Sequence, residues 1–457
     1  MVEKKDRDRS DNQPGGGWST EGLGYLQKQV ARQRVFVVHP YLKDRPASVI
    51  ERSPEARLDE AMGLAVAINI DLIGGELIPL RNIKPSTYMG QGKLDEVSQI
   101  IEDQEIEILI FDCELTPIQQ RNLERELKVK VIDRTALILE IFGDRASTKE
   151  GELQVELAHL VYQRSRLVRS WTHLERQRGG SGFMGGPGET QIEADRRIIA
   201  DRIVRIKKQL EAVTRTRTLH RAQRQKTPYP IIALVGYTNA GKSTLFNRLT
   251  EADVMAEDML FATLDPTLRS IDMPSGRKVI ISDTVGFISE LPTMLVSAFR
   301  ATLEEVLEAD IIVHVRDASH ADTDVQKHDV LNVLDELGVD FESETDGTPI
   351  LEALNKTDLM DDEARSSIEA HAERHDTCIP LSGLTGYGCE DLIQAIDDIL
   401  GTRDHEIEQL VPYSDGATQS WVHANTKILS EKHEEEGVRF HFIVDPILWA
   451  KFQKRAG

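Results

Sequence analysis

The sequence predicts a multidomain α/β protein, and three observations support this prediction. Between residues 228 and 402, short apolar runs alternate with helix-like stretches, which is typical of a mostly parallel sheet with flanking helices. Between residues 149 and 227, apolar residues recur at helical spacing on both sides of a glycine-rich segment, which favours a long antiparallel helical hairpin. Shorter strand and helix patterns predict a small α/β domain before the hairpin and a small C-terminal α/β module.

Composition indicates where these parts begin and end. With 457 residues, the chain is long enough for two to four domains. Residues 1–32 combine charge with glycine and proline, so we expect a disordered tail and no signal peptide. Prolines at 228 and 230 end the helical region before the central sheet. The other predicted segments are an N-terminal α/β domain at 33–148, a basic helical hairpin at 149–227, a central domain at 228–402 and a C-terminal α/β module at 403–457.

The two flanking segments contain recognisable elements. In the N-terminal segment we predict buried strands at 34–39 and 106–111 and helices at 58–70 and 94–102. Residues 90–93 read Gly-Gln-Gly-Lys, which lacks the spacing of a phosphate cradle and predicts a turn before the second helix. The elements of the C-terminal module are expected at 410–413, 422–429 and 438–444.

The hairpin is predicted from a four-then-three spacing of apolar residues in two stretches. Residues 179–188 lie between the stretches and contain too much glycine to continue either helix, so they predict an exposed tip. Arg164 interrupts the first stretch. The apolar positions are Leu153, Leu157, Leu160, Leu167, Trp171 and Leu174 in the first helix, and Ile192, Ile199, Ile203, Ile206, Leu210 and Val213 in the second.

Charge is distributed unevenly between the hairpin and the rest of the chain. The whole chain has a net charge of −22, but residues 159–226 contain 16 Lys or Arg and six Asp or Glu, a net charge of +10. This asymmetry favours contact between the hairpin and the RNA backbone, and the alternative is solvated charge on a coiled coil. The predicted RNA-contacting residues are Arg176, Arg178, Gly182, Gly186, Arg196 and Arg197.

The strongest local pattern follows the apolar run at residues 231–235. The segment GYTNAGKST has the spacing GxxxxGK[ST], in which glycines allow a sharp turn and successive amides converge on phosphate oxygens. Lys242 is expected to neutralise charge between the β- and γ-phosphates, and Ser243 to hold Mg²⁺. The alternative is a glycine turn before an ordinary helix. The predicted cradle residues are Gly236, Tyr237, Thr238, Asn239, Ala240, Gly241, Lys242, Ser243 and Thr244.

Two further patterns occur in the order expected of a guanine nucleotide site. DTVG at 283–286 supplies an aspartate for Mg²⁺ and a glycine amide that can sense the γ-phosphate. NKTD at 355–358 ends in a carboxylate that can accept two hydrogen bonds from guanine, and adenine lacks those donors. The loop at 382–384 can support the base. The predicted contacts to GTP or GDP are Asp283, Asn355, Lys356, Asp358, Ser382, Gly383 and Leu384.

Hydrolysis is expected to be slow without outside help. Phe287 follows DTVG where many GTPases place a glutamine that orients the attacking water, and a phenyl ring cannot make that bond. Thr263 is predicted to cover Mg²⁺, with Thr267 as the alternate. Asn239 is a candidate ligand for K⁺, which would be a second cofactor. The predicted catalytic residues are Lys242, Thr263, Gly286 and Phe287, and the predicted metal ligands are Ser243, Thr263 and Asp283.

Taken together, these motifs resemble those of HflX-type GTPases, which belong to the translation-factor-related class. The resemblance runs from about residue 34 to the C-terminus, and it departs slightly at the tip, where residues 183–185 replace a shorter loop. It implies a GTP-bound state that binds the large ribosomal subunit and helps to split stalled ribosomes, with a weak ATPase activity as a secondary implication. The motifs that carry it lie at 88–93, 115–117, 133–135, 179–191, 193–197, 261–267 and 283–287.

Two other classes of function remain open from the residues. One is a nucleotide-dependent RNA-remodelling enzyme of helicase type, or a GTPase partner in RNA modification. The other is a signalling or membrane-scaffold GTPase, against which the basic hairpin speaks. No apolar run approaches the ~20 residues of a membrane span, and three cysteines without metal-ligand spacing indicate a reducing compartment. We therefore expect a cytoplasmic monomer without integral membrane association, and peripheral association with a membrane stays open.

Overall fold

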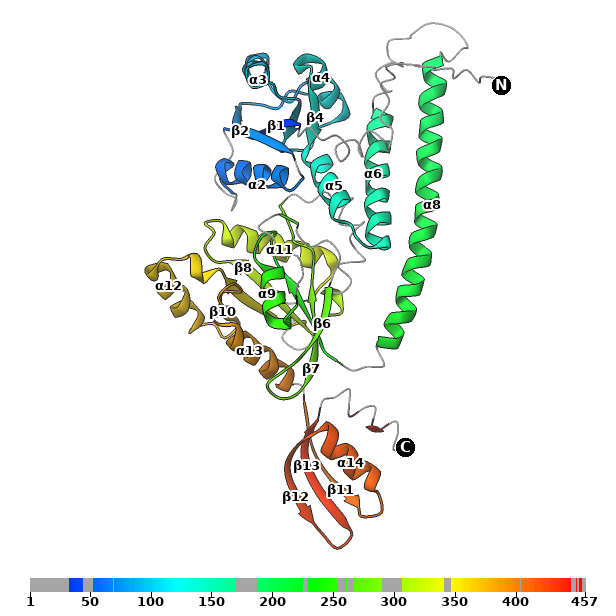
Figure 1. The fold of residues 1–457 in the computed structure, drawn as a ribbon, viewed down its shortest axis with the longest axis vertical. Coiled ribbons are helices and arrows are strands. Elements are labelled where there is room, and N and C mark those ends of the chain that lie inside the picture. Colours follow the sequence, from blue (N-terminus) through cyan, green and yellow to red (C-terminus); the bar gives the residue numbers. More distant parts are fainter. Residues whose placement is uncertain are drawn as a thin grey trace, which may run out of the picture.

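The computed structural model confirms the predicted fold class: a multidomain α/β protein with a mostly parallel sheet, N-terminal α/β and helical parts, and a C-terminal antiparallel sheet (Figure 1). The predicted tail at 1–32 lies outside the described residues, and the predicted domain boundaries stay a prediction. The structure describes residues 33–43, 52–68, 70–169, 187–224, 229–252, 260–261, 267–289, 306–340, 347–402, 404–444, 449 and 452–453.

The N-terminal part is built on a four-stranded parallel sheet in the order β2-β1-β3-β4. Its strands are largely buried runs, as expected of a parallel sheet covered by helices, and the predicted strands at 34–39 and 106–111 correspond to β1 and β3. The strands are β1 Arg34–Leu42, β2 Asp71–Leu80, β3 Ile108–Phe111 and β4 Lys130–Asp133, and the helices are α2 Pro54–Val66, α3 Gln91–Asp103, α4 Pro117–Leu127 and α5 Arg134–Arg145.

Both predicted helices of this part have different ends in the structure. The helix predicted at 58–70 runs from Pro54 to Val66, because Ser53 caps its start and Ala67 ends it before β2 begins. The helix predicted at 94–102 already begins at Gln91, with Gly90 as its N-cap residue. The Gly-Gln-Gly-Lys segment is therefore partly the first turn of α3.

The hairpin consists of α6 (Lys149–Arg169) and α8 (Pro187–Arg224), which lie side by side in Figure 1. Its seam contains most of the predicted apolar residues, but Leu167 of α6 is not among them. Arg202 of α8 donates to Glu156 of α6 at 2.7 Å. Trp171, Leu174 and residues 179–186 of the predicted tip lie outside the described residues, as does the side chain of Ile192. The last two residues of the predicted tip, Pro187 and Gly188, instead begin α8. The buried seam residues are Leu153, Leu160, Ile203 and Ile206, with Leu157, Val161, Ile199, Leu210 and Val213 packed against them.

The central sheet has the order β10-β9-β8-β5-β7-β6, and within it β6 is antiparallel to β7 while the other pairs are parallel. Apolar residues of α9 and α13 pack with the sheet in one hydrophobic cluster. Apolar residues of α11 pack with the sheet in a second cluster. The elements are β5 Ile231–Val235, α9 Lys242–Thr250, β6 Thr267–Asp272, β7 Lys278–Asp283, β8 Ile311–Asp317, α11 Thr323–Leu337, β9 Ile350–Asn355, η1 Thr357–Leu359, α12 Asp362–Ala372, β10 Cys378–Pro380 and α13 Cys389–Thr402.

The C-terminal module is an antiparallel sheet in the order β11-β13-β12 with one helix, α14 (Gly416–Asn425). Its strands are β11 His405–Pro412, β12 Lys427–His433 and β13 Gly437–Val444. The single element expected at 422–429 is divided in the structure, because α14 ends at Asn425 and β12 begins at Lys427.

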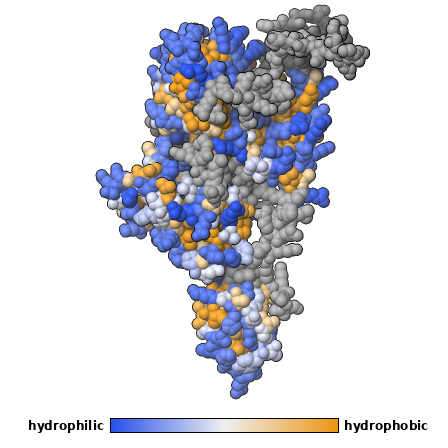
Figure 2. Space-filling view, in the orientation of Figure 1, coloured by the Kyte–Doolittle hydropathy of each residue, from blue (hydrophilic) through white to orange (hydrophobic). Residues whose placement is uncertain are grey.

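Figure 2 shows apolar residues as separate patches on each part of the molecule. Among the described helices, none has the length and apolar character needed to cross a membrane.

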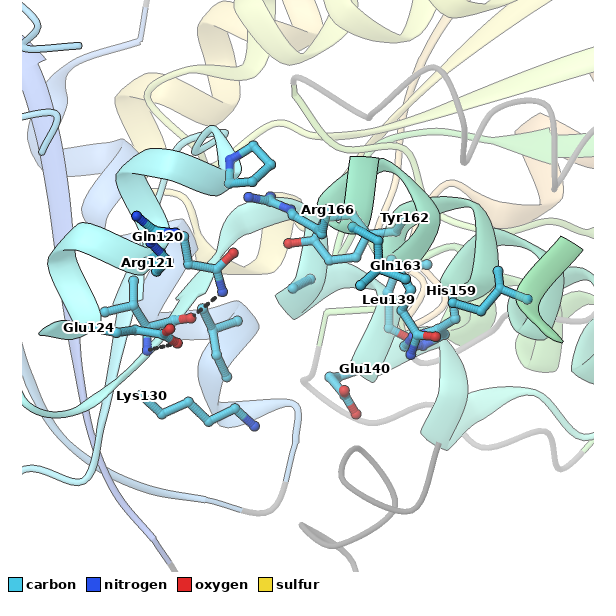
Figure 3. A pocket seen from close by; sticks show the side chains of 16 residues that line it. Gln120, Arg121, Glu124, Lys130, Leu139, Glu140, His159, Tyr162, Gln163 and Arg166 are labelled. Carbon is cyan, nitrogen blue, oxygen red and sulfur yellow. Dashed lines mark hydrogen bonds between the residues drawn. The ribbon is translucent and has the colours of Figure 1, made fainter. Parts of the chain in front are cut away.

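A cavity of about 230 Å³ lies between the N-terminal part and the hairpin (Figure 3). Residues of α4, β4 and α5 line one side of it, and residues of α6 and α8 line the other. Glu140 of α5 borders the cavity, and within the described part of the chain its Oε1 is buried without a hydrogen-bond partner. Burial raises the pKa of Glu140 to about 7, although Lys130 opposes the shift.

Replacing Glu140 with Gln is expected to stabilise the protein more at pH 8 than at pH 5. Because folding raises this pKa from 4.5 to about 7, the wild type loses stability as the pH rises through that window. We expect the gain at pH 8 to be about 1 to 3 kcal/mol. Thermal unfolding at both pH values measures it, with the exposed Glu126→Gln as control. An equal shift of Tm at pH 5 and pH 8 would contradict the prediction.

Candidate nucleotide site

The cradle begins where β5 ends, and two of its glycines are required by their positive φ and by close neighbouring atoms. Gly236 has φ +154°, and a Cβ there would lie 2.1 Å from the carbonyl oxygen of Val315. Gly241 has φ +89°, and its Cβ would lie 2.3 Å from Nδ2 of Asn355. Helix α9 starts directly after Gly241, so its N-terminal amides face the cradle. This arrangement suits an anionic ligand.

Lys242 is the buried cation of the cradle. Its Nζ donates to the carbonyl oxygens of Gly236 at 3.1 Å and Tyr237 at 2.8 Å. Burial lowers the pKa of Lys242 to about 8, and the negative charge of Asp283 opposes this shift. A phosphate group would compensate the buried ammonium charge, so the site fits the predicted ligand electrostatically.

The predicted metal ligands Ser243 and Asp283 meet beside Lys242. Ser243 Oγ, in the first turn of α9, donates to Asp283 Oδ2 at 2.8 Å, and Asp283 is fully buried at the end of β7. Hydroxyl and carboxylate oxygens are ligands that suit Mg²⁺. These two residues therefore fit the ion. Thr263 lies outside the described residues, and the alternate Thr267 stands in β6, paired in register with Asp283.

The DTVG segment packs directly against the cradle. The amide of Thr238 donates to the carbonyl oxygen of Phe287 at 2.7 Å, and the amide of Phe287 donates to that of Gly236 at 3.1 Å. A Cβ on Gly286 would lie 2.9 Å from Cα of Thr238. The ring of Phe287 is buried in the hydrophobic core, so Phe287 contacts the cradle through its backbone atoms.

The motif residues expected to bind the base converge from two loops. Asn355 Nδ2 donates to the carbonyl oxygen of Ala240 at 2.8 Å, and its Oδ1 accepts from the amide of Gly383 at 2.9 Å. Asp358 Oδ1 accepts from Ser382 Oγ at 2.6 Å. Asn355 therefore joins the cradle to the loop at 382–384, and Asp358 is held by that same loop.

The remaining predicted residues are distributed around the site. Lys356 forms an ion pair with Asp317 at 2.9 Å, and Leu384 is 67% exposed. Asn239 is exposed at the cradle with φ +60°. Thr244 lies in the first turn of α9. The assignment of these residues to nucleotide, metal and catalysis stays a prediction.

The predicted RNA-contacting residues lie elsewhere in the chain. Arg196 and Arg197 are exposed on α8, and Arg197 lies 3.8 Å from Glu193. The predicted tip contacts lie outside the described residues: Arg176, Arg178, Gly182 and Gly186.

Sequence reasoning missed residues of the N-terminal part that reach the nucleotide site. The hydroxyl of Tyr237 donates to Glu60 of α2, and it accepts from the amide of Ser289 at 2.8 Å. Arg134 of α5 donates to Glu60 at 2.6 Å and to the carbonyl oxygen of Ser289 at 3.1 Å. The motif at 133–135 was a signal, but nothing local in it indicates a contact with Ser289.

A phosphate cradle with its lysine, an aspartate beside the cradle serine, and a base-side Asn and Asp define a P-loop guanine-nucleotide-binding protein. Matches to family models agree: GTP-binding GTPase N-terminal at residues 55–143, GTP-binding GTPase Middle Region at 145–224 and 50S ribosome-binding GTPase at 231–356. The chain belongs to the HflX family of GTPases, and it binds and hydrolyses GTP.

The relatives cover most of the chain. It is 50% identical over 379 residues to GTPase HflX of Magnetococcus marinus, which covers 83% of this chain and 86% of the relative. It is 46% identical over 355 residues to GTPase HflX of Escherichia coli, at 77% and 81% coverage. A solved GTP-binding protein of Sulfolobus solfataricus in complex with GDP aligns at 25% identity and a TM-score of 0.43, covering 80% of this chain and 98% of that one.

Proposed function

We propose that this protein is a GTP-controlled switch that binds the large ribosomal subunit through its basic hairpin and helps to dissociate stalled ribosomes. The observation that carries the proposal is the charge of the hairpin in a chain that is otherwise acidic. The family model matched by the central domain, described as a 50S ribosome-binding GTPase, supports it. A ribosomal partner also implies a cytoplasmic location. The exposed basic residues of α8 include Arg196, Arg197, Arg202, Arg205, Lys207, Lys208 and Arg215.

In this proposal the cradle amides and Lys242 bind the phosphates, and Asp358 recognises guanine. Ser243 and Asp283 would hold Mg²⁺, with Thr263 as the third candidate ligand, and the ion would neutralise phosphate charge when bound. Asn239 is where a K⁺ ion would be held. Phe287 offers no polar side chain to orient water, so hydrolysis waits for the ribosome to complete the site.

Sedimentation of ribosomes with this protein and a non-hydrolysable GTP analogue tests the proposal. We expect the protein to move with large subunits and the fraction of intact ribosomes to fall. With GDP in place of the analogue, both effects should weaken. Absence of the protein from the large-subunit fractions would overturn the ribosomal role and favour the alternative, an RNA-remodelling enzyme, which RNA unwinding assays would then reveal.

Replacing both Arg196 and Arg197 with Ala is expected to weaken ribosome binding about tenfold and to flatten its salt dependence. Each phosphate contact contributes roughly 0.7 to 0.9 to the slope of log affinity against log salt, so the slope should fall by about 1.5. Sedimentation at several salt concentrations measures it. GTP affinity should not change, because both residues are exposed on α8.

A charge-matched control is Arg125→Ala with Lys278→Ala, since these side chains are 73% and 51% exposed and lie outside the hairpin, in α4 and β7. The control should bind ribosomes like the wild type. If both double variants lose ribosome binding equally, then the total charge of the protein determines binding, and not this face of the hairpin. If the Arg196 and Arg197 variant also loses GTP affinity, these arginines are structural.

A further inference from the structure

A buried polar cluster joins the N-terminal part to the GTPase domain. We call it the interdomain cluster, and it consists of Arg52, Glu60, Arg134, Tyr237 and Ser289. Arg52 and Arg134 both form ion pairs with Glu60, and the hydroxyl of Tyr237 donates to the same carboxylate. The Arg and Glu side chains of these pairs are 5% to 6% exposed. Such a network has fixed geometry, because a displaced member would leave a buried charge unpaired.

The cluster occupies the edge of the N-terminal sheet where parallel sheets commonly bind ligands. Asp112 follows β3 and Asp133 ends β4, both at the carboxyl ends of their strands. Asp112 accepts from Arg134 at 2.5 Å and contacts His39 at 2.8 Å. Burial opposes ionisation of Asp112, but Arg134 and His39 outweigh it and lower the pKa to about 2. Arg134 is thereby held in place to reach Ser289.

On the GTPase side, the cluster contacts two segments that must respond to the γ-phosphate. Tyr237 is the second residue of the cradle, and Ser289 is the third residue after Gly286. The backbone of Tyr237 pairs with that of Phe287, two residues before Ser289. Ser289 Oγ also donates to Asp329 of α11 at 2.6 Å. A movement of the DTVG segment would therefore change the distances within the interdomain cluster.

The residue before Arg134 holds the hairpin. Asp133 Oδ1 accepts from the hydroxyl of Tyr162 in α6 at 2.8 Å, and Asp133 forms an ion pair with Arg166 one turn further on. The guanidinium of Arg166 stacks over the ring of Tyr162 at 4.5 Å. Asp133 also caps α5, accepting from the amide of Ala136 at 2.9 Å. Its carboxylate is fully buried, so the attachment of α6 depends on its position.

We propose that the consecutive residues Asp133 and Arg134 couple the nucleotide state to the position of the hairpin. Arg134 is a positioning residue for the DTVG segment through Ser289, and Asp133 is the anchor of α6 through Tyr162 and Arg166. Both residues belong to the rigid start of α5, so a shift on the nucleotide side moves the anchor of the hairpin. The inference rests on the GTP site proposed above, but it requires no ribosome.

Coupling of this kind is reciprocal. If the bound nucleotide changes the position of the hairpin, then a change in the hairpin anchor must change the affinity for the nucleotide. Tyr162→Phe removes one hydroxyl and keeps the ring beneath Arg166, so the variant is expected to fold. Titration with GDP and with a non-hydrolysable GTP analogue should show that the ratio of the two affinities changes by about threefold to tenfold. Tyr413→Phe, an exposed tyrosine of the C-terminal module whose hydroxyl donates to Glu434, should leave the ratio unchanged.

Fluorescence energy transfer reports the hairpin movement itself. Labels at Asp201→Cys in α8 and Asp398→Cys in α13 occupy exposed positions, and Cys113→Ser in all samples leaves the buried Cys378 and Cys389 as the native thiols. Exchange of GDP for the GTP analogue should change the transfer in the wild-type background, and Tyr162→Phe should reduce that change at least twofold. Arg134→Lys should do the same, because a single ammonium cannot reach Asp112, Glu60 and Ser289 together.

The outcomes separate the coupling from the proposed function. Unchanged affinity ratio and transfer in Tyr162→Phe, with normal nucleotide binding, would overturn the coupling. A wild type that binds both nucleotides without any change in transfer would overturn it as well. Failure to bind ribosomes, with the coupling intact, would overturn only the ribosomal role.

Discussion

Replacing Asp358 with Asn is expected to reduce GTP affinity by about 10⁴-fold and to raise affinity for XTP. The carboxylate of Asp358 can accept from the ring N–H and the exocyclic amine of guanine, and Ser382 Oγ holds its Oδ1 at 2.6 Å. An Asn side chain turns one acceptor into a donor, which opposes the guanine amine but suits the oxygen of xanthine. Competition between GTP, XTP and ATP for a fluorescent guanine nucleotide measures the reversal.

A nearby control distinguishes base recognition from general damage. Asp362→Asn changes an exposed residue in the first turn of α12 and should leave GTP affinity at the wild-type value. Thermal unfolding of both variants checks that the loop at 382–384 is still folded. Unchanged GTP affinity in Asp358→Asn would show that Asp358 does not recognise the base. A preference of the protein for ATP would show that it recognises adenine and not guanine.

The cradle and the base-side residues could be predicted because their chemistry lies in short segments with fixed spacing. Gly236 is needed because the backbone of Val315 lies against it, and Gly241 because it has a positive φ at the turn into α9. Asn355 then meets Ala240 because β9 and β5 flank β8 in the central sheet, so their ends lie at one edge. Local pattern and sheet order together were sufficient for this part.

Half of the N-terminal sheet could not be predicted, for reasons visible in its residues. Strand β2 contains Gly74 and Gly75, which weaken the strand pattern. Yet a Cβ on Gly75 would lie 2.9 Å from Sδ of Met62, so the glycine lets α2 pack on the sheet. Strand β4 has only four residues, too few for a clear alternation.

The interdomain cluster escaped prediction because its members are far apart in sequence. Tyr237 lies 177 positions from Glu60, and Ser289 lies 155 positions from Arg134. A motif can indicate that Arg134 has some role. Only the packing of the N-terminal part against the GTPase domain shows that Arg134 contacts Ser289, just after the DTVG segment. Contacts of this kind are tertiary, and no spacing in the chain encodes them.

Replacing Gly286 with Ala is expected to lower GTP hydrolysis by about 100-fold while changing GDP affinity much less. A Cβ at this position would lie 2.8 Å from Cγ2 and 2.9 Å from Cα of Thr238, and 3.2 Å from Nζ of Lys242. The Thr238 backbone cannot yield as a flexible side chain would, so the DTVG segment must move away from the cradle. That movement breaks the two hydrogen bonds that Phe287 makes with the cradle.

The selectivity of the Gly286→Ala effect follows from which phosphate the segment faces. The amide of Gly286 is the group expected to sense the γ-phosphate, and GDP has none, so its affinity should stay within about threefold of the wild type. Gly401→Ala is the matched control, since a Cβ there meets nothing within 4 Å. Single-turnover hydrolysis with GDP titrations measures both quantities. Wild-type hydrolysis in Gly286→Ala would show that the DTVG segment does not act through its contact with the cradle.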